Sequence, residues 1–364
     1  MRWFGFGFNA FGQIVAEEKL KKGASSDDVR EVKVASPTEL ASCCSESHQI
    51  SASWSRRASL HLDGGGCVCL AGFGAERCAF VNQIRGCTDA CVAESRLILA
   101  FPDRIESWDL QGEEKTAPRI SERKPGRLGA PLNLPLVPGG YFAAKPPFHR
   151  LLAPQLTAKR LSLSAEHAVL LTAAGAVYTW GIGSHGQLGH GGLTSEEEPR
   201  VVEALWGMPM SCVATGGWHS ACISDGGDLY VWGWNESGQL GLPSRGLRKA
   251  PRQQYRQQAG ETPRGEDHDE VFLSIQAFPA LLDVAPSCEI RTVGCGSRHT
   301  AAVTTTGHLY TWGWGEYGQL GNRTLTSTDE PQRVAFFQQQ QLRVVDVVCG
   351  AWNTFAAVVK EEVT

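Results

Sequence analysis

The residues whose types and spacing could support chemistry include His167, His219 and His299, each of which is followed 13 positions later by a tryptophan. Three imidazoles could coordinate a metal ion, but metal ligands must converge on one point. These histidines instead recur once in each of three similar segments, so each should play the same part in its own segment. We therefore predict that they make structural hydrogen bonds, and we predict no metal.

The twelve cysteines could indicate zinc sites or disulfides. The close pairs Cys43-Cys44, Cys67-x-Cys69 and Cys87-x-x-x-Cys91 do not provide the matched C-x-x-C motifs of a structural zinc site. Four other cysteines lie inside repeat strands: Cys212, Cys222, Cys295 and Cys349. A free cysteine in such a strand behaves as a small buried hydrophobic residue. The sequence therefore favours buried thiols over zinc.

Glycine-rich segments offer only weak evidence for phosphate binding. Gly183-x-x-Gly186 and Gly315-x-x-Gly318 resemble fragments of a phosphate-binding loop, but each follows an expected strand and opens no helix, as that mechanism requires. No G-x-S-x-G or H-E-x-x-H motif stands out. We predict no catalytic residue and no cofactor, and so a protein that is not an enzyme.

The composition indicates a folded chain without a strong charge bias. Hydrophobic residues make up 42% and charged residues 20% of the 364 residues, and the formal net charge is −4. Neither end carries a run of Lys and Arg, so direct nucleic-acid binding is disfavoured. The start lacks a long apolar region and no run of 18 apolar residues occurs, so we expect a nuclear or cytosolic protein that does not span a membrane.

The three histidine segments are copies of one repeat. Each runs from its histidine through a glycine turn to Tyr-x-Trp-Gly and ends in Gly-Gln-Leu-Gly, with Trp180, Trp232 and Trp312 in equivalent positions. In all three, the last glycine comes 9 positions after this tryptophan. A short apolar run, a tight turn and an aromatic run predict a β-hairpin in every unit. The repeated tryptophan should pack between neighbouring sheets.

The two ends of the chain each match half of a repeat. Near the C-terminus, residues 349–358 match the first half, with Asn353 in the position of the histidine. At the N-terminus, residues 6–14 match the second half, with Phe6 in the position of the tryptophan. One sheet built from both ends would remove the exposed strand edges of an open array. We therefore predict an all-β fold, a closed β-propeller in which the N-terminal and C-terminal strands form one blade.

The remaining segments are less regular. Residues 47–110 contain two hairpins that lack the Gly-Gln-Leu-Gly loop, which gives six units, and residues 111–150 are either an irregular excursion or a seventh blade that cannot be recognised. Roughly 28 extra residues precede the third regular repeat and read as a long polar loop. We expect a single domain over residues 1–364, with irregular insertions or loops at 15–46, 111–150 and 243–272.

The repeat resembles that of the regulator of chromosome condensation family, over about half of the chain. That resemblance implies a seven-bladed propeller. The start, Trp-Phe-Gly-Phe-Gly-Phe, is similar to that of short family members consisting of little more than one propeller. This second resemblance implies a chromatin-linked adaptor in the nucleus, also possible in the cytoplasm, that binds and regulates a jumonji-C histone demethylase or oxygenase and supports chromosome segregation.

Two other functions remain open within this family. One is guanine-nucleotide exchange on a small nuclear GTPase, and the other is direct binding to nucleosomes or DNA. Family exchange factors look like basic-tailed proteins with seven regular repeats, whereas this chain is mildly acidic and has three regular internal repeats. We therefore expect a non-enzymatic scaffold that binds protein partners and is a monomer on its own.

One variable position suggests where a partner binds. The residue just before the histidine position is Glu166, Trp218, Arg298 and Trp352 in four units, so the repeat does not dictate its type. Variable positions on a fixed scaffold often carry recognition, and Trp and Arg are enriched among residues that dominate binding energy. The two tryptophans could instead pack against neighbouring blades. The polar loop at 245–270 is a second candidate, or a passive linker.

Overall fold

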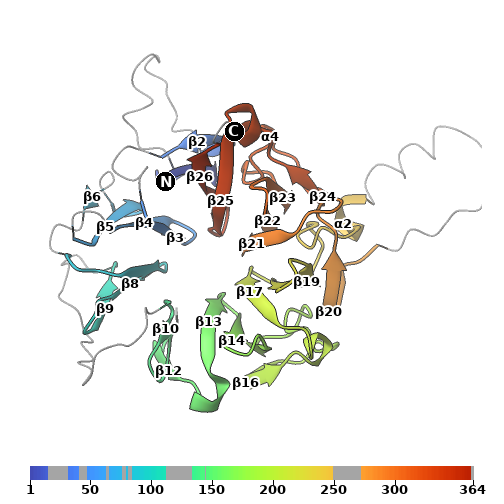
Figure 1. Ribbon diagram of the computed structural model, residues 1–364, viewed down its shortest axis with the longest axis horizontal. Helices are drawn as coiled ribbons and strands as arrows, with labels where there is room; N and C mark the ends of the chain where they lie inside the picture. Colours follow the sequence, from blue (N-terminus) through green and yellow to red (C-terminus); the bar gives the residue numbers. More distant parts are fainter. Residues whose placement is uncertain are drawn as a thin grey trace, which may run out of the picture.

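Seven β-sheets stand around a common axis as the blades of a propeller (Figure 1). This arrangement is seen in a computed structural model that describes residues 1–14, 32–40, 47–62, 65–75, 79–80, 84–111, 133–143, 145–248 and 272–361. The predicted all-β propeller is confirmed. No helix in these ranges is long and apolar enough to cross a membrane.

We number the blades in chain order, beginning with the one that contains both ends. The first four blades consist of these strands: in blade 1, β2 (Lys33–Glu39), β1 (Arg2–Phe8), β26 (Asn353–Lys360) and β25 (Leu342–Cys349); in blade 2, β3 (Gln49–Ala52), β4 (Arg56–His61), β5 (Cys67–Gly72) and β6 (Ala79–Phe80); in blade 3, β7 (Asp89–Val92), β8 (Arg96–Ala100) and β9 (Ile105–Asp109); in blade 4, β10 (Leu136–Val137), β11 (Gly140–Phe142) and β12 (His149–Leu151).

Blades 5 to 7 are the regular repeats, each with four strands. Their strands are β13 (Ala158–Leu163), β14 (His167–Thr172), β15 (Val177–Gly181) and β16 (Glu196–Val201) in blade 5; β17 (Met210–Thr215), β18 (His219–Ser224), β19 (Leu229–Trp234) and β20 (Ile275–Leu282) in blade 6; β21 (Ile290–Cys295), β22 (His299–Thr304), β23 (Leu309–Gly313) and β24 (Thr328–Arg333) in blade 7. Short helical segments connect some strands: η2 (Pro154–Leu156), η3 (Glu203–Leu205), α2 (Arg245–Arg248) and α4 (Ala335–Gln339).

The chain ends close the ring as the sequence predicted. Strand β1 pairs antiparallel with β26, from Arg2 opposite Val358 to Gly7 opposite Asn353. Both termini lie in the same blade in Figure 1. The backbone groups of the two terminal strands therefore satisfy each other, and neither is left as an open edge.

Two of the segments expected to be irregular contain strands. Strand β2 occupies Lys33–Glu39, inside the 15–46 segment, and pairs with β1. Residues 136–151 form blade 4, so the blade alternative for 111–150 holds there. Its strands have only two or three residues and stand among prolines, which cannot donate to a sheet, so no alternating pattern was visible. Residues 15–31, 41–46, 112–132 and 249–271 of these three segments lie outside the described residues.

Glycines follow the tryptophan position because the hairpin brings two backbones together there. Gly181, Gly233 and Gly313 have φ values of 110°, 110° and 102°, a region that other residues rarely adopt. A Cβ on Gly233 would lie 2.5 Å from the carbonyl oxygen of Trp218. The equivalent Gly7 in blade 1, with φ 113°, faces the Trp352 carbonyl oxygen in the same way.

The hydrophobic core is divided among the contacts between neighbouring blades. One cluster joins blades 5 and 6, another joins blades 6 and 7, and another joins blades 7, 1 and 2. Further clusters join blades 2 with 3, 3 with 4 and 4 with 5. The largest fully buried side chains include Trp3, Trp232, Trp312, Phe6 and Phe355. Each blade is therefore stable only beside its neighbours, which makes closure a condition for the whole fold.

A polar relay also crosses the contact between blades 6 and 7. The His219 Nε2 lies 2.9 Å from the Thr300 hydroxyl, and that hydroxyl donates to the backbone carbonyl of Gln239 at 2.6 Å. The Trp312 indole N–H donates to the same carbonyl at 3.0 Å. Because the hydroxyl hydrogen is used, the imidazole must carry its own proton on Nε2 and act as the donor.

The same relay joins blade 5 to blade 6 and, without an indole, blade 7 to blade 1. Between blades 5 and 6, the His167 Nε2 lies 2.8 Å from the Ser220 hydroxyl. That hydroxyl and the Trp232 indole N–H each donate to the Gln187 carbonyl at 2.8 Å. Between blades 7 and 1, the His299 Nε2 lies 3.0 Å from the Thr354 hydroxyl, which donates to the Gln319 carbonyl at 2.8 Å. Phe6 takes the tryptophan place in blade 1 and packs on Gly321, where a Cβ would come within 2.7 Å of the ring.

Arginines replace the histidines in blades 2 and 3. The guanidinium of Arg56 donates to the carbonyls of Phe73 in its own blade and of Glu94 and Leu110 in blade 3. Arg96 lies 3.8 Å from the ring centroid of Phe148 in blade 4. A longer side chain can reach the next blade where no Gly-Gln-Leu-Gly loop supplies a nearby carbonyl.

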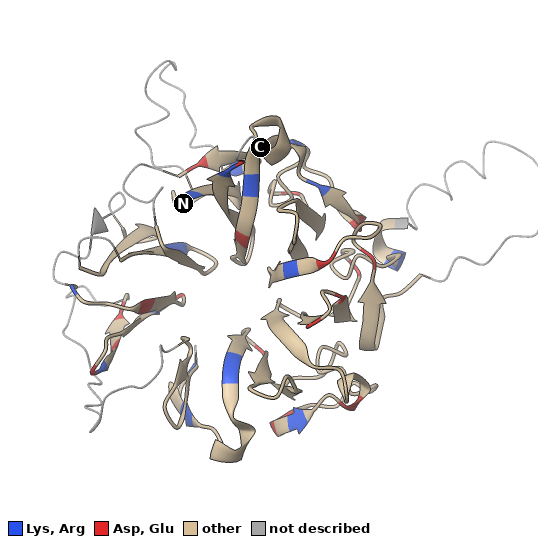
Figure 2. Cartoon of the chain, in the orientation of Figure 1, with Lys and Arg blue, Asp and Glu red and all other residues tan. Residues whose placement is uncertain are grey.

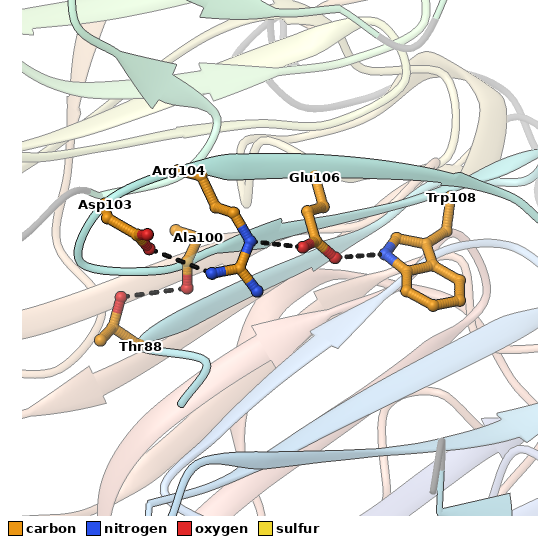
Figure 3. A network of polar contacts seen from close by, with 6 residues as sticks. All are labelled: Thr88, Ala100, Asp103, Arg104, Glu106 and Trp108. Atoms are coloured by element: carbon orange, nitrogen blue, oxygen red, sulfur yellow. Dashed lines mark hydrogen bonds and ion pairs between the residues drawn. The ribbon is translucent and has the colours of Figure 1, made fainter. Parts of the chain in front are cut away.

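Blade 3 also satisfies its tryptophan within its own strand (Figure 3). The Trp108 indole donates to a Glu106 carboxylate oxygen at 3.0 Å, and the other oxygen pairs with Arg104 at 2.6 Å. Arg104 in turn contacts Asp103 at 3.1 Å. The carboxylate therefore replaces the backbone acceptor that the preceding blade offers in the regular repeats.

Removing one hydroxyl of the relay should destabilise the ring. Thr300→Val keeps the shape of the side chain but leaves the fully buried His219 Nε2–H without its acceptor. We expect the free energy of unfolding to fall by about 1–3 kcal/mol. Urea unfolding measures this, with the exposed Thr305→Val as the control that should stay within about 0.5 kcal/mol of the wild type. Equal stability of both variants would contradict the role of the relay.

The relay should also make stability depend on pH. Burial lowers the pKa of His167, His219 and His299 from 6.5 to about 3. The unfolded chain binds these protons first, so this stability is fully present above about pH 6.5 and is lost as the pH falls toward about 3. Between about pH 7 and 5 each histidine should account for roughly 2 kcal/mol of the loss. His299→Asn introduces the residue type that blade 1 has at this position, Asn353. It should remove the part of the pH dependence of stability that His299 contributes. Urea unfolding of the wild type and of His299→Asn at several pH values measures this. The same slope of unfolding free energy against pH in both proteins would contradict the assignment.

Candidate protein-docking face

The four predicted partner-binding residues occupy one repeated backbone position. The carbonyl of each accepts the N–H of the residue that follows the conserved hairpin glycine in the same blade, at 2.8–2.9 Å. The pairs are Glu166 with Ile182, Trp218 with Trp234, Arg298 with Trp314, and Trp352 with Phe8. The backbone is therefore the same in all four blades, while the two side chains of each pair differ. All of these positions lie at one end of the blades, because they begin or follow the loops on that side.

The side chains of these pairs reach across to neighbouring blades. The Arg298 guanidinium of blade 7 lies 4.8 Å from the ring centroid of Trp234 and 5.8 Å from that of Trp218, both in blade 6. Trp352 of blade 1 packs edge-on against Trp314 of blade 7, with centroids 4.7 Å apart. Each contact joins two blades that the sequence separates widely.

A third position in the repeat extends this group. The residue before each Gly-Gln-Leu-Gly motif is held by the buried glutamine, whose Oε1 accepts its backbone N–H at 2.8–3.1 Å. In blade 7 this residue is Tyr317, whose ring centroid lies 5.0 Å from Trp314 and 5.1 Å from Phe8. In blade 1 it is Phe11, 5.6 Å from Trp54 of blade 2.

These contacts form a continuous surface across blades 6, 7, 1 and 2, which we call the aromatic arc. Its members are Trp218, Trp234, Arg298, Trp314, Tyr317, Trp352, Phe8, Phe11, Trp54 and Phe73. All are at least partly exposed, and Trp54 and Phe73 reach 46% and 57%. A contiguous exposed aromatic surface of this kind marks an interaction site more often than a chance feature of a monomer.

Ten of the eleven tryptophans divide into two chemical groups, and the exposed Trp206 lies outside both. The indole N–H groups of Trp3, Trp108, Trp180, Trp232 and Trp312 all donate to acceptors inside the protein. The five tryptophans of the aromatic arc have no such acceptor among the described residues. Burial thus forces the first group to be satisfied, whereas the second group presents its donors at the surface.

The structure separates the four predicted residues. Trp218, Arg298 and Trp352 belong to the aromatic arc, whereas Glu166 lines a separate pocket of about 100 Å³ between blades 4 and 5, together with Lys145 and Arg150. The alternative of packing between blades also applies in part, because Trp352 both contacts a neighbouring blade and remains partly exposed. The second candidate, the 245–270 loop, lies mostly outside the described residues.

Sequence reasoning missed seven members of the aromatic arc, all of them aromatic. The available signal was the residue after Trp-Gly, which is as variable as the residue before the histidine: Ile182, Trp234, Trp314 and Phe8. Trp54 and Phe73 stand in a blade whose repeat is degraded, and no periodicity pointed to them.

Metal-binding geometry does not occur in the part of the chain that the structure describes, since no three His, Cys, Asp or Glu side chains group together there. The three repeat histidines bond across three different blade contacts. Cys212, Cys222 and Cys295 are buried free thiols, and Cys349 is a partly buried one. Cys69 differs from the expectation, because it is in a disulfide.

Comparison with known proteins identifies the repeat. The family model "Regulator of chromosome condensation (RCC1) repeat" matches residues 174–223, 226–303 and 306–357. RCC1 domain-containing protein 1 from Homo sapiens is 42% identical over 388 residues, covering 99% of this chain and 97% of that protein. The chain belongs to the RCC1 repeat family. The Mus musculus protein of the same name is also 42% identical, over 97% of this chain and 96% of its own length.

The solved RCC1 propellers show the same fold. Prp20p from Saccharomyces cerevisiae superimposes with a TM-score of 0.69 at 15% identity, covering 99% of this chain and 91% of that chain. At this identity the likeness concerns the fold alone. The RCC1 family thus accounts for the repeat and the propeller fold.

A matched pair of tryptophans tests whether the aromatic arc is needed for folding. Trp232→Ala removes a fully buried side chain and should lower the free energy of unfolding by about 3–5 kcal/mol. Trp234→Ala, two residues along the same strand, removes a partly exposed side chain and should cost well under half of that. Thermal and urea unfolding measure both. A similar loss in the two variants would mean that the arc is part of the core.

Proposed function

We propose that this protein is a non-enzymatic platform that binds a protein partner through the aromatic arc. The observation that carries the proposal is the arc itself: ten side chains from four blades that pack on one another and stay partly exposed at one end of the propeller. Aromatic residues and arginine are the residue types that contribute most to binding energy in protein interfaces. The rigid ring holds them in place, which reduces the entropy lost on binding.

The resemblance to the family supports a proposal for the class of partner. The resemblance to short single-propeller members, and the similarity to RCC1 domain-containing protein 1, support a chromatin-linked adaptor in the nucleus. Its partner would be a jumonji-C oxygenase of the histone-demethylase kind, which the chain binds and regulates in support of chromosome segregation. In this role the chain acts as a monomer that supplies a surface and no catalytic group.

The charge distribution favours a protein partner over nucleic acid. Basic and acidic residues are interspersed along the described blades in Figure 2, and the whole chain has a net charge of −4. Binding to phosphates requires several Lys and Arg on one face. Prp20p is described as binding Gsp1p and histones, so a small GTPase is the competing partner to be distinguished by experiment.

The test measures binding of a purified jumonji-C oxygenase by isothermal titration calorimetry. Trp314→Ala should weaken binding at least tenfold, because an aromatic anchor in the middle of an interface contributes roughly 2 kcal/mol or more. The control is Trp206→Ala, which removes a tryptophan that is 79% exposed at the opposite end of the blades and should leave binding unchanged.

Two outcomes would overturn the proposal. One is equal binding by both variants, which would place the interface elsewhere. The other is binding of a small GTPase in place of the oxygenase, with faster nucleotide release when the chain is added in catalytic amounts. The second result would establish the exchange-factor alternative.

A further inference from the structure

We infer that the aromatic arc recognises an acidic linear segment whose carboxylate pairs with Arg298 and whose apolar side chains rest on the neighbouring rings. This inference rests on the proposed function, because it assumes that the partner binds at the arc. It adds the chemistry of the segment that the arc selects.

The first argument is an imbalance of hydrogen-bonding groups. The five arc tryptophans each offer an indole N–H that has no acceptor among the described residues, and Arg298 adds the N–H groups of a guanidinium. The side chains in return offer few acceptor atoms, because indoles, phenyl rings and guanidinium accept no conventional hydrogen bond. They are the Tyr317 hydroxyl oxygen and, on the ring of His185 that packs against Trp218 and Trp234, the imidazole nitrogens, of which Nδ1 already lies 2.9 Å from the Ser184 hydroxyl. A partner that complements this surface must therefore be rich in acceptors and poor in donors.

The second argument is the state of Arg298. Its guanidinium lies against Trp234 and Trp218 at 4.8 and 5.8 Å from the ring centroids. It forms no ion pair with a described carboxylate, and its Nε is buried without a hydrogen-bond partner. Stacking uses the face of the guanidinium and restricts its motion, while its two terminal Nη groups, unlike the buried Nε, stay available for a carboxylate. The side chain is thus prepared for bidentate binding before any partner arrives.

The third argument is the charge along the arc. Lys33 lies 5.5 Å from the ring centroid of Tyr317 and likewise pairs with no described carboxylate. The Glu94 carboxylate, beside Trp54, already accepts from the backbone N–H of Trp54 and from the hydroxyl of Ser55 at 2.6 Å. Among the described residues, neither of these two cations has a counter-ion, so an acidic segment complements the arc and a basic segment does not.

Peptide display on the immobilised full-length chain tests this inference. A library of random dodecapeptides is selected on the wild type, and enriched peptides are resynthesised for fluorescence-polarisation titrations. We expect them to combine Asp or Glu with aromatic or branched aliphatic residues. Replacing the acids by Asn or Gln should raise the Kd at least tenfold, as should Arg298→Gln in the protein. The two changes together should cost little more than either alone, because they remove the same contact.

Matched variants at the opposite end of the blades serve as controls. Arg343→Gln removes an exposed arginine beside the blade 7 hairpin turn, and Trp206→Ala removes an exposed tryptophan. Neither should change the Kd of the selected peptides. Unchanged thermal unfolding of Arg298→Gln would show that any loss of binding is local.

The outcomes separate this inference from the proposed function. Neutral or basic peptides that lose binding in Trp234→Ala would overturn the inference while the arc remains a docking face. Acidic peptides that bind Arg298→Gln as tightly as the wild type would overturn it as well. If no selected peptide responds to Trp234→Ala or Trp314→Ala, both the inference and the proposed function fail.

Discussion

The backbone carbonyl of the glutamine in each Gly-Gln-Leu-Gly loop is the point on which the regular part of the ring depends. In blades 5 and 6 it accepts hydrogen bonds from a hydroxyl and an indole N–H of the next blade. That hydroxyl in turn accepts a hydrogen bond from a buried neutral histidine in the same blade as the glutamine. Such a chain stabilises the fold only when every buried donor in it has an acceptor, because an unmatched donor in this dry environment costs more than a hydrogen bond gains. The requirement explains why the histidine, the hydroxyl, the tryptophan and the loop recur together.

The same interaction connects local structure to the candidate site. The glutamine that offers its carbonyl to the next blade also uses its side-chain oxygen to hold the residue before the loop, such as Tyr317 beside Gln319. One buried residue thus joins two blades and positions a surface side chain. Since these bonds involve backbone groups, the residue at the surface position is free to vary without loss of the scaffold.

Two kinds of polar contact join neighbouring blades of the ring. Blades 5 to 7 and the joint with blade 1 use the histidine relay, whereas blades 2 and 3 use Arg56 and Arg96 to reach the next blade. The aromatic arc extends over blades 6, 7, 1 and 2, and so crosses both the split blade and the change from one kind of joint to the other. The docking face proposed for this protein therefore depends on ring closure, because Phe8 and Trp352 come together only when the two chain ends pair.

The sequence by itself determined the repeat, the hairpins, the ring and the blade shared by both termini. These features are visible because one set of local bonds recurs at fixed spacing, and Asn353 and Phe6 keep that spacing even where the residue type changes. Only the tertiary structure decided the extent of the aromatic arc and the existence of blade 4. The arc joins Phe8 and Trp314, which occupy the same position in two repeats, to Trp54, which stands in a blade whose repeat is degraded. Blade 4 has strands of two or three residues, which are too short to show an alternating pattern. Contacts between blades depend on how the ring closes, and no pattern within a single repeat contains that information.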